Sequence, residues 1–308
     1  MKDFLPGEGS GHGYRSALIV ANPISGRGLG RRAAEELSTG LRQRGIPCEV
    51  HLTGGRGDAF EKLRTMEQPA DLVVAVGGDG TVREVLDGLV DPSTHVGLLP
   101  IGTANVLATE LGLPRDVHHA LDILIGGRAM EIDVLRVNGT LATFVVGVGI
   151  DALTVRELER RRRGPIRKSH YLPAAFRALR GYRPPELAVE LDGSVVEGTF
   201  GFVLVSNTTG YGAVLHLSPD ARMDDGELEV YLFPKGTKRE LLGAFVRGVV
   251  GHLPAGAVRM ERARSIRIRS REEVPYQVDG DLGGVTPVEV ALAPNRYTVL
   301  VPRVESSP

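Results

Sequence analysis

The stretch that most constrains this chain lies at residues 72–85, Leu-Val-Val-Ala-Val-Gly-Gly-Asp-Gly-Thr-Val-Arg-Glu-Val. Five apolar residues open it and predict a buried parallel strand. Three glycines around one aspartate follow, and the apolar spacing after Thr81 predicts a helix. A glycine-rich turn before a helix N-terminus binds anions, because the backbone can approach a phosphate and free N–H groups point at it. The stretch therefore predicts a phosphate-binding edge.

The aspartate inside this turn, Asp79, adds a second requirement. A carboxylate repels a bare phosphate, but it suits one that is accompanied by a divalent cation, since carboxylate oxygens are ligands that Mg²⁺ prefers. We therefore predict that Gly77, Gly78 and Gly80 cradle phosphate and that Asp79 serves Mg²⁺. The alternative is a plain turn that needs glycines and uses Asp79 or Thr81 as a helix cap.

Strands and helices alternate in the first third of the chain. Apolar segments at residues 17–21, 48–53, 72–76 and 96–99 predict strands, and helical patterns separate them. This alternation predicts a doubly wound α/β domain with a mostly parallel sheet, in which ligands bind beyond the carboxyl ends of the strands. Each strand exit carries Gly, Ser, Thr, Asn or Asp. Turn chemistry explains one or two such exits, whereas four at one edge favour a nucleotide site.

The pattern changes after residue 127, where strands follow one another with few helices between them. We expect a mostly antiparallel, β-sandwich-like second domain. Its predicted strands are at residues 132–137, 142–148, 187–191, 195–206, 228–233, 265–270, 274–278 and 288–292. Helical patterns interrupt them at 152–163, 171–180 and 238–250, and the last apolar run, 297–301, can join either domain.

The expected organisation is a flexible leader (1–15), a nucleotide-binding domain (16–131), a β-rich domain (132–296) and a C-terminal segment (297–308) that can return to the first domain. A net charge of −1 creates no overall field toward nucleic acid, so no such partner is expected. No apolar run reaches the roughly 18 residues of a membrane helix, and no signal-peptide pattern is present, which favours a cytoplasmic protein. The sequence leaves monomer and homodimer open.

Five short motifs resemble those of bacterial diacylglycerol kinases and their relatives, the sphingosine, ceramide and NAD kinases. Residues 77–85 resemble the GGDGT signature and favour the lipid-kinase branch. Residues 22–26, Asn-Pro-Ile-Ser-Gly, resemble the family's first nucleotide loop. Residues 100–105, Pro-Ile-Gly-Thr-Ala-Asn, resemble a segment that contacts ATP. The segments at 217–228 and 277–281 resemble two later motifs, and all occur in family order.

The resemblance implies a kinase that uses ATP and Mg²⁺, with the nucleotide on the first domain and a lipid against the second. The contacts that it and the glycine-rich turn imply for the nucleotide are Asn22, Pro23, Ser25, Gly26, Thr53, Gly77, Gly78, Asp79, Gly80, Thr81 and Thr103. Each threonine alone could be only a helix cap. This chain departs from the family after Asn105, where the family usually has Asp and this sequence has Val106.

The resemblance assigns the proton acceptor to the last acidic residue of a late "DGE" motif, which is Asp281 here, while Asp79 is the second catalytic carboxylate. Asp281 is one methylene shorter than the family's glutamate, so Asp279 could share its work. Carboxylates one residue apart on a strand face opposite sides, but a turn at Gly280 can bring them together. Asp279-Gly280 is by itself also a strong hairpin signal.

The motif at residues 217–228 implies a structural Mg²⁺ bound by the Asp225 side chain and the backbone carbonyls of Arg222 and Glu227. Such a donor set suits a hard cation, although the Asp-Asp-Gly sequence also reads as a plain turn. The basic run from Arg160 to Lys168 is either a solvated helix end or a docking surface for anionic lipid, which would make the protein peripheral on a membrane.

The expected function is transfer of the γ-phosphoryl group of ATP to a lipid hydroxyl, with diacylglycerol as the first choice. An NAD kinase is one alternative, but it gives no reason for the Asp-rich motifs at 224–226 and 279–281. A non-catalytic nucleotide- or lipid-binding protein is the other, and Asp281 and Val106 are the features that favour it. The sequence does not distinguish diacylglycerol from other lipid alcohols.

Overall fold

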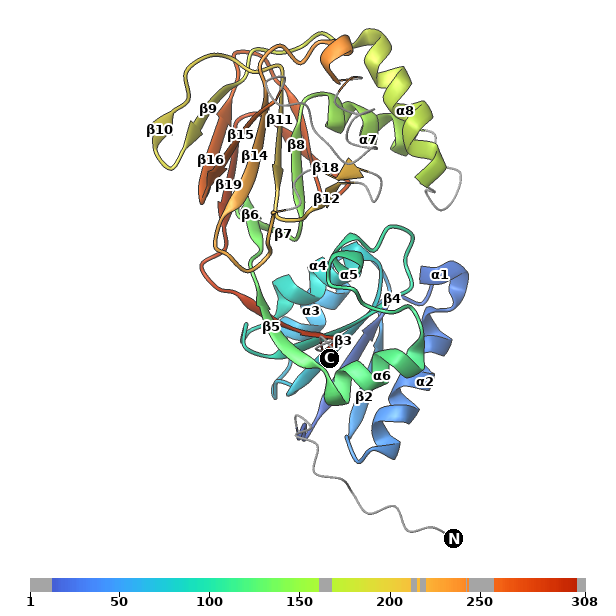
Figure 1. Cartoon of the computed structure of the whole chain (residues 1–308). Helices are drawn as coiled ribbons and strands as arrows, with labels where there is room; N and C mark the ends of the chain where they lie inside the picture. The colour runs from blue at the N-terminus through green and yellow to red at the C-terminus, as the bar shows by residue number, and fades with distance from the viewer. Residues whose placement is uncertain are drawn as a thin grey trace, which may run out of the picture.

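The computed structural model describes residues 13–160, 168–211, 215–216, 220–241, 243 and 258–303. These residues form an α/β domain and a domain of antiparallel sheets, seen as the two lobes of Figure 1. The fold class predicted from the sequence is therefore confirmed. No helix within the described ranges is long and apolar enough to cross a membrane.

The first domain is built on one six-stranded sheet of order β2-β1-β3-β4-β20-β5. Its strands are β1 (Ala17–Ala21), β2 (Cys48–Leu52), β3 (Leu72–Gly77), β4 (His95–Pro100), β20 (Tyr297–Val301) and β5 (Arg128–Ile132). Strand β20 is parallel to β4, and β5 is antiparallel to β20. The last apolar run of the chain thus lies in the first domain, between β4 and β5.

Helices cover both faces of this sheet because each has one apolar stripe. Buried side chains of α2 (Gly30–Gln43) and α6 (Val117–Gly126) pack on one face. Those of α3 (Asp58–Arg64) and α4 (Asp79–Gly88) pack on the other. Two short elements, α1 (Ser25–Gly28) and α5 (Val106–Glu110), follow β1 and β4.

The second domain contains two six-stranded sheets, β10-β9-β16-β19-β6-β7 and β15-β14-β11-β8-β17-β18. Their strands are β6 (Leu135–Val137), β7 (Thr140–Ala142), β8 (Val145–Val148), β9 (Ala188–Leu191), β10 (Ser194–Val195), β11 (Phe202–Ser206), β14 (Leu228–Phe233), β15 (Arg259–Ala263), β16 (Ser265–Arg269), β17 (Pro275–Val278), β18 (Asp281–Val285) and β19 (Val288–Leu292). A separate pair joins β12 (Gly210–Tyr211) to β13 (Leu215–His216). Leu228, Val230 and Leu232 alternate into the core between the sheets.

The outer face of the second of these sheets packs against helices. Tyr231 and Phe233 of β14 point to this face, where they join side chains of α7 (Ile150–Arg160) and the neighbourhood of α8 (Lys168–Gly181). Figure 1 shows α7 and α8 together at this side of the upper lobe. Val106 of α5 belongs to the same apolar cluster, so the cluster links the two domains.

The strand predictions differ from the structure mainly at breaks. The segment at 142–148 is interrupted after Ala142, because the amides of residues 143–145 bind the Asp279 carboxylate. The segment at 195–206 is divided between β10 and β11, and Gly198 adopts a left-handed φ of 103° between them. Strands β5, β15 and β18 were not predicted; the sequence of β15, Arg-Met-Glu-Arg-Ala, is that of a polar edge strand.

Candidate active site

The carboxyl ends of four adjacent strands, β2, β1, β3 and β4, carry the loops of the candidate site. In Figure 1 this edge of the first domain faces the second domain. It carries every residue predicted to contact the nucleotide: Asn22, Pro23, Ser25, Gly26, Thr53, Gly77, Gly78, Asp79, Gly80, Thr81 and Thr103. The structure therefore places these residues on one edge, although they come from four separate loops.

Glycines allow two of these loops to touch through their backbones. A Cβ atom on Gly102 would lie 2.5 Å from Gly78 Cα and 2.6 Å from Asn105 Oδ1, which no side chain can tolerate. The amides of Ile101 and Gly102 donate to the Gly77 carbonyl at 3.0 and 3.1 Å. Such an approach requires glycine, as in phosphate-binding loops. The loop after β4 thus packs against the GGDGT turn and is hydrogen-bonded to it.

The first loop is held in a similar way. The Asn22 side chain accepts the Ile24 amide through Oδ1 at 3.1 Å, and the backbone amide of Asn22 donates to the Val76 carbonyl at 3.0 Å. Gly26 has a φ of 60°, and a Cβ there would lie 3.1 Å from the Ile101 carbonyl oxygen. Pro23 and Ser25 are partly exposed at the same turn. This loop can therefore present backbone groups to a ligand.

The three threonines are not equivalent. Thr103 is exposed and Thr53 is partly exposed, so both hydroxyls can reach a ligand. Thr81 is buried, and its hydroxyl lies against Gly77 where a Cβ of that residue would be. The Thr81 hydroxyl therefore occupies the space that a side chain on Gly77 would need, so Thr81 has a packing role. Its predicted contact with the nucleotide would require the hydroxyl to reach out from a buried position.

Asp79 is the first residue of α4 and is poorly satisfied by the protein. Its Oδ1 accepts one long hydrogen bond, 3.4 Å from the Leu107 amide. Burial raises the pKa of Asp79 to about 6, the charge of Asp279 adds to this effect, and amides at the start of α5 oppose it. The buried Oδ1 of Asn105 also has no hydrogen-bond partner among the described residues. A carboxylate and an amide oxygen left in this way suit a cation and its phosphates.

The late motif forms the hairpin between β17 and β18. Asp279 and Gly280 have φ values of 51° and 87°, which is typical of a two-residue type I′ turn. The Asp279 carboxylate accepts the amides of Thr143, Phe144 and Val145 at 2.7–3.1 Å and the Thr143 hydroxyl at 3.1 Å. Asp279 is therefore committed to the fold, and the hairpin leaves Asp281 to face the first domain.

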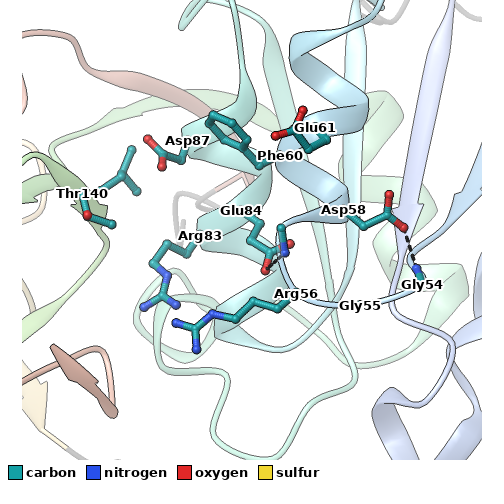
Figure 2. A pocket seen from close by; sticks show the side chains of 12 residues that line it. Gly54, Gly55, Arg56, Asp58, Phe60, Glu61, Arg83, Glu84, Asp87 and Thr140 are labelled. Atoms are coloured by element: carbon teal, nitrogen blue, oxygen red, sulfur yellow. Dashed lines mark hydrogen bonds between the residues drawn. The ribbon is translucent and has the colours of Figure 1, made fainter.

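Two arginines of the first domain hold Asp281. Its Oδ2 lies 2.9 Å from Nη2 of Arg83 on α4 and 3.4 Å from Nη2 of Arg56 in the loop after β2. Both arginines line a pocket of about 630 Å³ formed by the loop after β2, α3, α4 and β7. Figure 2 shows their guanidinium groups close to each other on the same side of this pocket. Glu84 Oε1 accepts the Gly57 amide at 2.9 Å and so fixes the loop to α4.

The predicted structural metal loop is shaped by a residue outside the motif. Asp133 accepts the Gly226 amide at 2.8 Å and the Arg296 Nε at 2.8 Å, while its own amide donates to the Met223 carbonyl. Asp225 Oδ1 accepts the Glu227 amide at 3.1 Å.

The loop's side chains do not add a second anionic ligand. The Arg222 side chain pairs with Asp224, and the described residues contain no cluster of three His, Cys, Asp or Glu side chains for a metal. The structural Mg²⁺ at Asp225 and the carbonyls of Arg222 and Glu227 stays a prediction, because its only support is that carboxylate and carbonyl oxygens are the donors that Mg²⁺ takes.

Several residues of this site were missed by the sequence reasoning. The sequence indicates Arg83 and Arg56 only as parts of their motifs, and it gives no signal for Asp133. Gln277 Oε1 accepts the Gly280 amide at 2.7 Å, and its Nε2 donates to Asp151 Oδ2 at 2.7 Å, so this side chain braces the hairpin. The pairs Arg83–Asp281, Gln277–Asp151 and Asp133–Gly226 lie 198, 126 and 93 positions apart, and spacing in the sequence gives no signal for them. The one local signal concerns Arg83, which follows Asp79 by four residues and therefore shares a helix face with it.

Three predictions fall largely outside the described residues, and one of them is the helix expected at 238–250, of which 242 and 244–250 are not described. The basic run from Arg160 to Lys168 is described only at its two ends, and residues 1–12 of the expected leader are likewise outside. Residues 217–219 of the metal motif are also outside.

Both domains of this chain match known protein families. Residues 16–137 match the family model "Diacylglycerol kinase catalytic domain" and residues 144–301 match "YegS C-terminal NAD kinase beta sandwich-like domain". The chain is 28% identical over 294 residues to a diacylglycerol kinase of Bacillus subtilis, covering 94% of this chain and 97% of the relative. It is 28% identical over 293 residues to that of Staphylococcus haemolyticus, covering 94% and 89%.

Solved structures show the same fold. A crystal structure of a diacylglycerol kinase from Bacillus anthracis superposes with a TM-score of 0.72 at 21% identity, covering 94% of this chain and 97% of that one. Two further structures from that organism reach TM-scores of 0.78 and 0.76. The same family is indicated by the models that match the two halves of the chain, by the curated relatives and by the fold. The chain belongs to the bacterial diacylglycerol kinase-like family, which indicates a kinase.

Proposed function

We propose that this protein is an ATP-dependent lipid kinase that transfers the γ-phosphoryl group to a lipid hydroxyl, most simply that of diacylglycerol, giving phosphatidate. The observation that carries the proposal is the 2.9 Å contact between Asp281 and Arg83. It brings a carboxylate of the second domain to the helix that begins at the GGDGT turn. A kinase needs this combination of a phosphate cradle and a base for the acceptor hydroxyl.

The first domain supplies the nucleotide site in this proposal. Gly77, Gly78 and Gly80 present their backbone to the phosphates, and a Cβ on Gly80 would meet no atom within 4 Å, so space for a ligand is open there. The exposed Thr103 and the partly exposed Thr53 donate hydroxyl hydrogen bonds to nucleotide oxygens. Asp79 holds Mg²⁺ with its under-used carboxylate. The cation would neutralise charge on the β- and γ-phosphates.

The second domain supplies the acceptor side. Asp281 accepts the proton of the lipid hydroxyl as that oxygen attacks phosphorus. Asp279 does not share this work, because four hydrogen bonds from residues 143–145 occupy its carboxylate. The loop of Arg222, Asp225 and Glu227 would hold a structural Mg²⁺ beside this domain.

Val106 occupies a buried position where the family usually has Asp. Val106 is 8% exposed and packs in the interdomain cluster with Phe144 and Tyr231. An ionised Asp at this place would lose its hydration without a partner in that cluster. The curated relatives are named diacylglycerol kinases, which favours diacylglycerol among lipid alcohols. We further propose that the protein reaches this substrate from the cytoplasm as a peripheral protein, with the basic run from Arg160 to Lys168 on anionic lipid.

The test is transfer of ³²P from labelled ATP with Mg²⁺ to a panel of lipid alcohols in mixed micelles, with NAD in a parallel reaction. The wild type is compared with Asp79→Ala and Asp281→Asn. Labelled phosphatidate that disappears with both substitutions supports the proposal. Labelled NAD beside inert lipids would make the protein an NAD kinase. Bound ATP with no labelled product would indicate a non-catalytic binding protein and contradict the proposal.

A further inference from the structure

The two oxygens of the Asp281 carboxylate are in different situations. Both arginine contacts are made to Oδ2, at 2.9 Å from Arg83 and 3.4 Å from Arg56. Oδ1 accepts no hydrogen bond from any residue within the described ranges. A base that must take a proton needs one oxygen free and the carboxylate held in place. The contacts at Asp281 have this form.

The two arginines differ in how firmly they can hold Oδ2. The Arg83 side chain is 14% exposed and extends from a regular helix, whereas that of Arg56 is 78% exposed and extends from a loop. An exposed ion pair at 3.4 Å contributes little, because water and salt screen it. Arg83 is therefore the contact that can fix the orientation of the carboxylate.

Arg83 also links Asp281 to the nucleotide side of the site. Asp79 and Arg83 are four residues apart on α4, so they lie on the same face of one helix. Within the second domain, Gln277 fixes the backbone of the hairpin through Gly280, but it does not touch the Asp281 side chain. The aspartate is one methylene shorter than the family's glutamate, so a partner from the opposite domain is needed to draw it toward the phosphate edge.

We propose that Arg83 is the positioning residue of Asp281: it holds Oδ2 from the opposite domain so that Oδ1 meets the acceptor hydroxyl. This inference rests on the proposed function. In the step that it serves, the hydroxyl proton passes to Oδ1 while the hydroxyl oxygen forms a bond to the γ-phosphorus. The bond from that phosphorus to the β–γ bridging oxygen breaks, and ADP leaves with that electron pair. Arg83 remains protonated and bound to Oδ2 throughout.

The kinetic test compares Arg83→Ala and Arg83→Lys with the control Arg136→Ala. The control removes another ion pair between the domains, from Arg136 of β6 to Asp87 of α4 at 3.3 Å, without touching Asp281. We expect Arg83→Ala to lower kcat at least 50-fold with KM for ATP changed less than threefold, Arg83→Lys to recover part of kcat, and the control to stay within threefold. A tenfold higher KM for ATP with kcat preserved would instead make Arg83 a nucleotide ligand and overturn the proposal.

A double substitution tests whether Arg83 acts through Asp281. If it does, Arg83→Ala combined with Asp281→Asn transfers phosphate no more slowly than Asp281→Asn alone. A further loss of tenfold or more in the double variant would show an independent role and overturn the inference.

Hydrogen exchange provides a test that needs no substrate. Arg83→Ala is expected to speed amide exchange at residues 280–285 at least fivefold, while Arg136→Ala leaves those amides unchanged. Unchanged exchange in Arg83→Ala would overturn the positioning contact whatever the acceptor is. Faster exchange in a protein that labels no lipid would preserve the contact but overturn the proposed function, so the two failures are distinguishable.

Discussion

Within the described residues, the Asp79 carboxylate of the first domain accepts one hydrogen bond, from the Leu107 amide at 3.4 Å, with the amides of Asn105 and Val106 close enough to lower its pKa. The Asp279 carboxylate of the second domain accepts four hydrogen bonds, at 2.7–3.1 Å. Burial raises the pKa of both carboxyl groups, and the charge of Asp279 contributes to the rise at Asp79. The Asp279 carboxylate is thus fully hydrogen-bonded within the described residues, whereas the Asp79 carboxylate is not. Buried polar groups are normally paired, so the under-bonded acid marks the place for a ligand and the satisfied one a structural joint.

The largest effect is expected from removing the Asp279 carboxylate, which joins the β17–β18 hairpin to residues 143–145. Asp279→Ala leaves three backbone amides without their acceptor, so we expect the free energy of unfolding to fall by on the order of 4 kcal/mol. Urea denaturation at pH 7 measures it. The matched control is Asp192→Ala, at a second hairpin turn with Gly193, where the exposed carboxylate accepts the Arg264 and Ser265 amides. A loss at Asp279 no larger than at Asp192, about 1 kcal/mol, would contradict the comparison.

The next effect concerns the backbone contact behind the GGDGT turn. Gly102→Ala places a methyl group against Gly78 Cα, so the two loops must separate, and we expect a loss of about 3 kcal/mol in unfolding free energy with loss of ATP binding. Gly80→Ala has room for its methyl group and should leave stability within about 0.5 kcal/mol. If Gly80→Ala nevertheless weakens ATP binding in calorimetry, the open space at Gly80 belongs to the nucleotide. Equal stability losses in both variants would refute this reading.

Asp79→Asn should stabilise the protein while removing its activity. The pKa of Asp79 is about 6 in the folded state, above the ordinary 3.8, so ionisation opposes folding. The stability associated with the protonated acid is complete below about pH 4 and is lost as the pH rises through 6. Asn does not ionise, so at pH 7.5 the variant gains about 2 kcal/mol in unfolding free energy. Urea denaturation in EDTA without nucleotide, at pH 4 and 7.5, measures the unfolding free energy of the variant and the wild type. Equal stability of the two proteins at pH 7.5 would contradict the raised pKa of Asp79.

The smallest effect separates the exposed threonine from the buried one. Thr103→Ala should leave unfolding free energy within about 0.5 kcal/mol and raise Kd for ATP about fivefold, as expected for one lost hydrogen bond. Thr81→Ala should mainly lower stability, by about 1–2 kcal/mol, because its hydroxyl is packed against Gly77. Calorimetric ATP titration and urea denaturation distinguish them. The opposite pattern would place Thr81, not Thr103, on the ligand.

The sequence was a good guide to the first domain because its signals are local. Gly77, Gly78 and Asp79 are consecutive, and a strand, a turn and a helix follow one another within 14 residues. The fold class and the family followed from such runs and are confirmed. The individual nucleotide and metal contacts, including Thr53 and Asp225, stay predictions, since no ligand tests them.

The second domain was harder because its side of the site is assembled from distant residues. Asp279 reaches back to Thr143, Gln277 to Asp151, and Asp281 across to Arg83. Each pair is more than 120 positions apart, and no periodicity predicts it. The same contacts explain the wrong strand boundary at Ala142, because amides that bind a carboxylate cannot continue a strand ladder.

The return of β20 to the first sheet means that the polypeptide crosses between the domains twice. The two crossings run side by side: Ala293 N donates to the Val134 carbonyl at 2.8 Å, and Arg296 pairs with Asp133 at 2.8 Å. The second domain is, in gene-level terms, an insertion within the first. A fragment ending before residue 297 would therefore lack an interior strand of the nucleotide-binding sheet.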